Sequence, residues 1–201
     1  MPQTLAKTRK RLTHEERHEH LLDVAAKLML EHGFEAVTME AVKERAGVSR
    51  GLAYTHFVSA EELVFALYER EMTELERRLD AMAATSGAFD DRVRTATQTY
   101  FAFVADRGGL LATLQIKLPE RWFEASVRER LARLLRHWSD AVEQEFGVTQ
   151  AHARSLSRAA LAATEMLAAA LRGKYLTRGD AERLSAEFVI GGLRRAAGDP
   201  R

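Results

Sequence analysis

The sequence contains no cysteine, which excludes disulfides and zinc sites built on cysteine ligands. It has only 3 prolines among 201 residues. No segment alternates apolar and polar residues in the way expected of a β-strand rich in Val, Ile and Thr. The abundant residue types are Ala, Leu, Arg and Glu, which are strong helix formers. These features predict an all-α fold.

Long apolar runs are absent as well. The longest, residues 161–171, is too short to span a bilayer and is interrupted by Thr164 and Glu165. The first residues are basic but are not followed by the apolar core of a secretory signal. We therefore expect a cytoplasmic protein with no membrane partner.

Positive and negative charges are nearly balanced, with a formal net charge of +1, so bulk charge does not identify an anionic partner. A basic arm near the start of the chain is the local exception, and it consists of Lys7, Arg9, Lys10 and Arg11. The rest of the first 58 residues is rich in acids. If this region binds nucleic acid, we therefore expect it to use the arm and one polarised face.

Helix start and stop signals predict nine helices. Thr13 and Glu16 have the spacing of a capping box, and Gly33 ends the helix that they open. Two short helices follow at residues 38–46 and 50–57. The six later helices are expected at residues 59–84, 92–107, 110–117, 120–146, 150–172 and 180–197, with a break at Gly108–Gly109.

The second and third predicted helices are joined by a three-residue turn that contains Gly47. Two short helices joined in this way have the geometry of a helix-turn-helix. Ser49 would cap the third helix, and Val48 would point back into the core. Spacing alone leaves a second interpretation open, in which the segment is a plain helical corner with Tyr54 and Phe57 in the core.

The outward residues of the third helix suit DNA. Arg50 can donate two hydrogen bonds to guanine, Gly51 permits close approach of the backbone, and Leu52 can contact a thymine methyl group. Hydroxyl and imidazole groups for phosphate oxygens or base edges come from Tyr54, Thr55 and His56.

Several motifs run from the first to the fourth predicted helix with consistent spacing: Ala25-Ala26, EHGF, VTM, AGVS, G-x-x-Y-x-x-F and EEL. Through them, the segment from Thr13 to Leu63 resembles the N-terminal domain of TetR-family transcriptional regulators. The remaining residues match that family in length and helical content alone. The resemblance implies a nine-helix fold, with a DNA-binding domain at residues 1–58 and a ligand-binding and dimerisation domain at residues 59–201.

The resemblance also implies a homodimer whose two recognition helices enter successive major grooves of a palindromic double-stranded operator. It implies DNA contacts at Thr38, Met39, Ser49, Arg50, Gly51, Leu52, Tyr54, Thr55 and His56. Two positions depart from the family pattern, since Ala60 replaces a usual lysine and Thr55 replaces a frequent histidine or other ring. We therefore expect a shallower salt dependence of DNA binding unless the basic arm compensates.

Aromatic residues in the C-terminal region could form a solid core or line an apolar cavity. Glu165 lies in an otherwise apolar helix, where a carboxylate must be paired, hydrogen-bonded, protonated or at a boundary. It could recognise a ligand, pair with Arg94 or Arg158, or lie at the edge of a dimer interface. The residues that we predict to bind a ligand are Tyr100, Phe103, Trp122, Trp138, Glu165 and Met166.

Enzymatic chemistry has little support. Glu15 and His18 match the Glu-x-x-His motif of di-metal bundles, but the sequence has no second such motif. It also has no nucleophile elbow and no glycine-rich phosphate loop. We therefore expect no enzyme activity, no cofactor and no metal site, and a helical metalloenzyme is the least favoured alternative.

The last two predicted helices are rich in small residues, and the resemblance implies that they form the dimer interface. We predict a ligand-responsive homodimeric regulator, and specifically a repressor that a small apolar or amphipathic effector releases from its operator. The break at Gly108–Gly109 and the helix from Ser59 are the expected points of transmission. The alternative is a DNA-binding regulator whose bundle is a solid core without a sensor.

Overall fold

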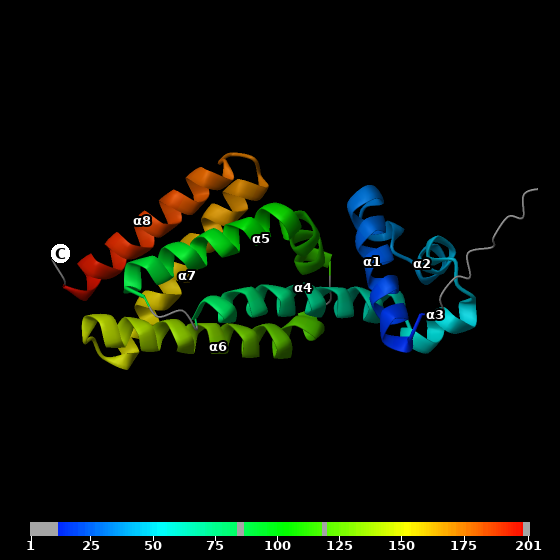
Figure 1. The fold of residues 1–201 in the computed structure, drawn as a ribbon, viewed down its shortest axis with the longest axis horizontal. Coiled ribbons are helices and arrows are strands. Elements are labelled where there is room, and N and C mark those ends of the chain that lie inside the picture. Colours follow the sequence, from blue (N-terminus) through cyan, green and yellow to red (C-terminus); the bar gives the residue numbers. More distant parts are fainter. Residues whose placement is uncertain (1–11, 84–86, 118–119, 199–201) are drawn as a thin grey trace, which may run out of the picture. The chain divides into compact units, whose positions relative to one another are not determined.

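The computed structural model of the chain describes residues 12–83, 87–117 and 120–198, and these residues contain helices but no strand (Figure 1). The all-α prediction is confirmed. The chain forms two compact units, Met1–Leu67 and Tyr68–Arg201. The helices are α1 (His14–His32), the 3₁₀ helix η1 (Phe34–Ala36), α2 (Met39–Ala46), α3 (Arg50–His56), α4 (Ala60–Ala83), α5 (Phe89–Lys117), α6 (Glu120–Phe146), α7 (Gln150–Arg172) and α8 (Arg178–Ala197).

The first unit packs α1 against η1 and α2, and α2 against α3. Leu21, Val42 and Ala53, one residue from each of the three α-helices, are completely buried at its centre. The capping box predicted for α1 is confirmed, because the Glu16 N–H donates to Thr13 Oγ1 at 3.1 Å and the Thr13 N–H donates to Glu16 Oε2 at 2.7 Å. Local sequence signals therefore fix where α1 begins.

The second unit is a helical bundle in which α7 packs against α5, α6 and α8, and α5 packs against α8 (Figure 1). One buried apolar cluster takes residues from all four of these helices, among them Val93, Val142, Ala153 and Ile190. Near this cluster, Arg194 Nη2 donates to Asp90 Oδ1 at 2.8 Å and joins α8 to α5.

The predicted break at Gly108–Gly109 is wrong, because α5 runs continuously from Phe89 to Lys117. Each interior glycine destabilises a helix by about 1 kcal/mol. Val104, Leu110 and Leu114, on either side of the glycines, are buried. Burying one such side chain contributes about 1.5–3 kcal/mol, so tertiary packing outweighs the local penalty. The described residues form nine helices, which are eight α-helices and the 3₁₀ helix η1. The number agrees with the prediction, but η1 was not predicted from the sequence.

The two compact units divide inside α4, after Leu67. Leu63 and Leu67, in the first two turns of α4, are completely buried. The functional boundary expected at residues 58 and 59, just before α4, stays a prediction. Within the described residues, no helix is long and apolar enough to cross a membrane.

Candidate nucleic-acid interface and effector cavity

The turn between α2 and α3 depends on Gly47, which adopts a left-handed conformation with φ 65° and ψ 40°. Its N–H donates to Glu44 O at 3.1 Å, and the Val48 N–H donates to Lys43 O at 3.1 Å, so the last carbonyls of α2 are satisfied. Ser49 then opens α3, with its Oγ accepting from the Leu52 N–H at 3.2 Å. These bonds produce the short turn of a helix-turn-helix.

The outer face of α3 presents polar and apolar groups to solvent. Arg50 and Gly51 are exposed, and Leu52 and Tyr54 keep 39% and 40% of their surface. Ala53, on the opposite side, is completely buried. The plain-corner interpretation therefore fails for Tyr54 but holds for Phe57, which is 2% exposed and ends the helix.

Arg50 and Tyr54 lie one helical turn apart, and the Arg50 guanidinium carbon lies 5.4 Å from the centre of the Tyr54 ring. A cation–π contact of this kind orders the guanidinium while its N–H groups remain able to donate. Thr55 is more restricted, because its Oγ1 donates to Leu52 O at 2.7 Å. In this conformation its hydroxyl can accept a hydrogen bond but has no proton for a phosphate oxygen.

Two of the residues expected to contact DNA have side chains that turn away from the outer face. Met39 is 8% exposed and belongs to the core, so its side chain is not available for DNA. The His56 ring packs on α1, with its centre 4.2 Å from that of His14 and 6.1 Å from that of His18. The expectation of an outward His56 is therefore corrected.

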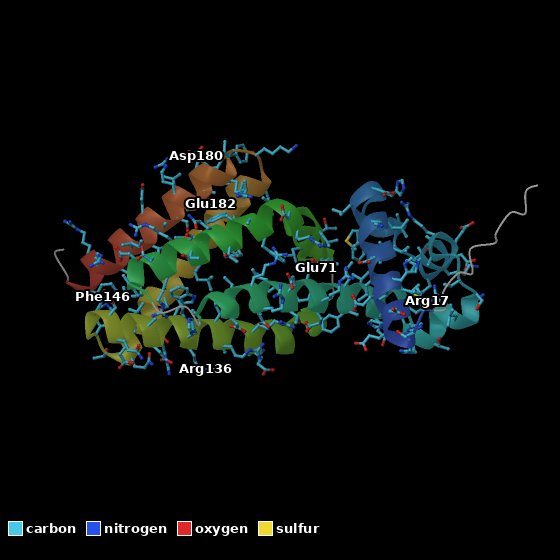
Figure 2. All side chains as sticks on the ribbon, viewed as in Figure 1. Arg17, Glu71, Arg136, Phe146, Asp180 and Glu182 are labelled. Atoms are coloured by element: carbon cyan, nitrogen blue, oxygen red, sulfur yellow. The ribbon has the colours of Figure 1, made fainter. Side chains whose placement is uncertain are left out.

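The environment of His56 disfavours its charged form. Its Nδ1 is buried and has no hydrogen-bond partner. Burial, followed by the influence of His14, His18 and Arg17, lowers the pKa of His56. Figure 2 labels Arg17, which lies on α1. An imidazole in this setting stays neutral more readily than a solvated one.

The remaining predicted DNA contacts fall in two places. Thr38 is exposed, and its Oγ1 caps α2 by accepting from the Ala41 N–H at 3.1 Å. The basic arm of Lys7, Arg9, Lys10 and Arg11 lies outside the described residues. Within the described residues, no group of three or more His, Asp or Glu side chains is arranged to hold a metal ion, including those near Glu15 and His18.

Comparison with known proteins bears on this helix-turn-helix. The sequence model of the family described as "Bacterial regulatory proteins, tetR family" matches residues 21–67. The HTH-type transcriptional activator FasR of Mycolicibacterium smegmatis is 32% identical over 94 residues, covering 47% of this chain and 43% of FasR. Over residues 21–67, the chain is thus similar to regulators of the TetR family.

A second curated relative shows how far the likeness extends. The Fatty acid metabolism regulator protein of Bacillus subtilis is 17% identical over 127 residues, covering 63% of this chain and 64% of the relative. The chain thus spans less than two thirds of the length of these curated relatives.

Solved structures confirm the TetR fold over most of the chain. A TetR-like transcriptional regulator from Rhodococcus sp. RHA1 has a TM-score of 0.74 at 22% identity and covers 91% of this chain and 98% of its own. The fatty acid degradation regulator FadR from Bacillus halodurans has a TM-score of 0.74 at 15% identity. This match covers 92% of the present chain and 99% of FadR.

The helical bundle contains a cavity of about 690 Å³, and α4, α5, α6, α7 and α8 all contribute to its lining. Its walls are mostly apolar, with Met72, Leu75, Val93 and Leu134 among the lining residues. A space of this size lies in the range of small-molecule sites, which span about 300–1,000 Å³. The bundle thus has room for a small molecule, and a sensor function stays a prediction.

The predicted ligand residues are placed unequally. Tyr100, Trp138 and Glu165 line the cavity, which brings them together as expected. Phe103 is completely buried and does not line it, and Met166 is 71% exposed and points away. The side chain of Trp122 lies outside the described residues.

Glu165 is partnered across the bundle by neither of the arginines considered from the sequence. The Tyr100 hydroxyl donates to Glu165 Oε1 at 2.6 Å, joining α5 to α7. Burial and the neighbouring Glu165 carboxylate raise the pKa of Tyr100, so its hydroxyl stays protonated as the donor. One oxygen of an exposed carboxylate is thereby fixed at the rim of the cavity.

Two further polar groups of the cavity wall were not recognised from the sequence. Arg130 Nη2 donates to Glu69 Oε2 at 2.6 Å and its Nη1 donates to Glu76 Oε2 at 2.7 Å, which ties α6 to α4. Ser157 on α7 is 4% exposed, and its Oγ has no hydrogen-bond partner among the described residues. Both residues interrupt apolar helical stripes, a signal that could have identified them.

Proposed function

We propose that this chain is a TetR-family DNA-binding transcriptional regulator in which α3 enters the major groove of an operator. The observation that carries the proposal is the helix-turn-helix, which leaves Arg50, Leu52 and Tyr54 exposed on one helix. These side chains offer a guanidinium for guanine, methyl groups for thymine and a hydroxyl for phosphate.

The chain is proposed to act as a homodimer through α7 and α8. Support comes from exposed apolar groups on both helices, with Met166 71% exposed and Phe188 64% exposed. Gly191 and Gly192 present open backbone on α8, where an added Cβ would meet no atom within 4 Å. A partner helix can approach such a surface closely. A two-fold dimer would space its two α3 helices by about 34–36 Å, one turn of DNA.

The effector is proposed to bind in the cavity and to release the protein from DNA. Support comes from α4, which contributes Tyr68, Met72, Leu75 and Leu79 to the cavity wall. The same helix begins in the first unit, where Leu63 and Leu67 are buried. A ligand that favours a different position of α4 therefore acts on both units, to the extent of its differential affinity for the two states.

The test uses DNA that wild-type protein enriches from a random pool. Replacing Arg50 and Tyr54 with Ala should reduce binding of that DNA by at least about thirtyfold, because two contacts of about 1–3 kcal/mol each are lost. Lys27→Ala is the control, since it removes one positive charge from an exposed position on α1. Equal binding by the double variant and the control would contradict the assignment of α3.

A further inference from the structure

A second, smaller cavity adjoins the apolar one within the helical bundle. Its volume is about 260 Å³. The two cavities have six lining residues in common, which are Glu76, Leu79, Ala96, Arg130, Leu134 and Trp138. The two cavities therefore lie side by side.

The smaller cavity differs from the larger one in its charge. Ionisable residues that line it and not the larger cavity come from α4, α5 and α6, and they are Asp80, Asp91, Arg92, Arg133 and His137. The wall of the larger cavity is mostly apolar, although Arg158 and Glu165 also line it, whereas charged residues make up much of the wall of the smaller one. An amphiphile has the same division between its chain and its head group.

Among the charged residues of the smaller cavity, Arg92 is in the least favourable environment. It is half-buried, and its guanidinium makes no hydrogen bond or ion pair with any residue in the described part of the chain. A guanidinium that loses water without gaining a partner is unfavourable. Arg133, from α6, lines the same cavity and donates to Glu129 Oε1 at 3.1 Å and to Glu76 Oε1 at 3.2 Å.

The carboxylates of the smaller cavity, unlike the Arg92 guanidinium, are solvated or already paired. Asp80 is exposed and solvated, and the Asp91 side chain keeps 73% of its surface and pairs with Arg94 Nη1 at 3.6 Å. Glu76 already accepts from Arg130 and Arg133. The group that gains most from a ligand is therefore the Arg92 guanidinium, and this favours an anion over a cation.

We propose that the effector is a single-chain amphiphile with an anionic head group, whose chain fills the apolar cavity and whose head binds Arg92. This inference rests on the proposed effector cavity and specifies its ligand class. A head group held between Arg92 and Arg133 competes with Glu76 for the Arg133 guanidinium. Since Glu76 belongs to α4, binding weakens the ion pairs that join α4 to α6.

The first experiment compares four probes that share one alkyl chain: dodecanoate, dodecyl phosphate, dodecanol and dodecyltrimethylammonium. Their affinities for the full chain are measured by isothermal titration calorimetry, below the concentrations at which the probes form micelles. Each anion should bind at least about tenfold more tightly than the alcohol or the cation, as one charge-assisted contact provides.

The second experiment uses a charge-matched pair of variants. Arg92→Gln should weaken binding of dodecanoate about tenfold or more and leave dodecanol unchanged. Arg183→Gln removes the same charge from a side chain that is 56% exposed and lines neither cavity. It should leave both affinities unchanged. The head-group comparison on wild-type protein still decides the question if Arg92→Gln does not fold.

The outcomes separate this inference from the proposed function. Equal binding of dodecanol and dodecanoate, or tighter binding of the ammonium probe, overturns the anionic head group and leaves the effector cavity in place. Unchanged dodecanoate affinity in a folded Arg92→Gln variant overturns the role of Arg92. If none of the four probes binds, both the ligand class and the proposed effector cavity are contradicted.

Discussion

Replacing Gly51 with Ala should change the stability of the fold and the affinity for DNA in opposite directions. A Cβ added at this exposed position of α3 would meet no atom within 4 Å, and the backbone there is helical. Ala is more favourable than Gly inside a helix, so Gly51→Ala should raise the free energy of unfolding by about 0.5–1 kcal/mol. If the backbone at Gly51 lies against DNA, the same methyl group must displace the helix. Operator affinity should then fall about tenfold or more.

The assay pairs urea unfolding with fluorescence anisotropy on the selected operator. Gly109→Ala is the matched control, because Gly109 is an exposed interior residue of α5 whose added Cβ also meets no atom within 4 Å. It should stabilise the protein to a similar extent without changing operator affinity. If Gly51→Ala is stabilised and still binds the operator as tightly as wild type, α3 does not approach DNA closely and the reasoning is refuted.

Two further predictions concern stability. The pKa of His56 is lowered in the folded protein, so below about pH 6.5 the unfolded chain binds more protons and the folded state loses stability as the pH falls. Urea unfolding at pH 7.5 and pH 5.5 should show this loss, and His56→Gln should reduce it; an unchanged difference would contradict the buried imidazole. Arg130→Ala leaves Glu69 and Glu76 without their shared partner and should destabilise the second unit by about 1–3 kcal/mol, whereas Arg77→Ala, at a largely exposed position, should change stability far less. Equal effects of these two Arg variants in urea unfolding would contradict the importance of the Arg130 cluster.

Features that depend on neighbouring residues could be predicted from the sequence. The capping box of Thr13 and Glu16, the left-handed Gly47 and the Ser49 cap are formed within four residues of chain, so residue type and spacing are enough. The continuity of α5 through Gly109 could not be predicted in this way. It depends on the burial of apolar side chains by other helices, and local propensity carries no information about that burial.

The same distinction between local features and features set by helix packing applies to the candidate site. Spacing placed Arg50 to His56 on one helix but did not give the rotation of that helix, so the contact of His56 with His14 was not foreseen. The Tyr100–Glu165 hydrogen bond joins residues that are 65 positions apart, and the sequence offered several other partners for the same carboxylate. Such pairs follow from how the helices pack, which periodicity alone does not determine.

The symmetry of the DNA that wild-type protein selects from a random pool tests the central claim most directly. A two-fold dimer with an α3 in each major groove predicts an inverted repeat whose half-sites are centred about 10–10.5 base pairs apart, or a multiple of that spacing. The Arg50→Ala, Tyr54→Ala double variant should fail to enrich it. Enrichment of no sequence, or of the same sequence by the double variant, would contradict the account.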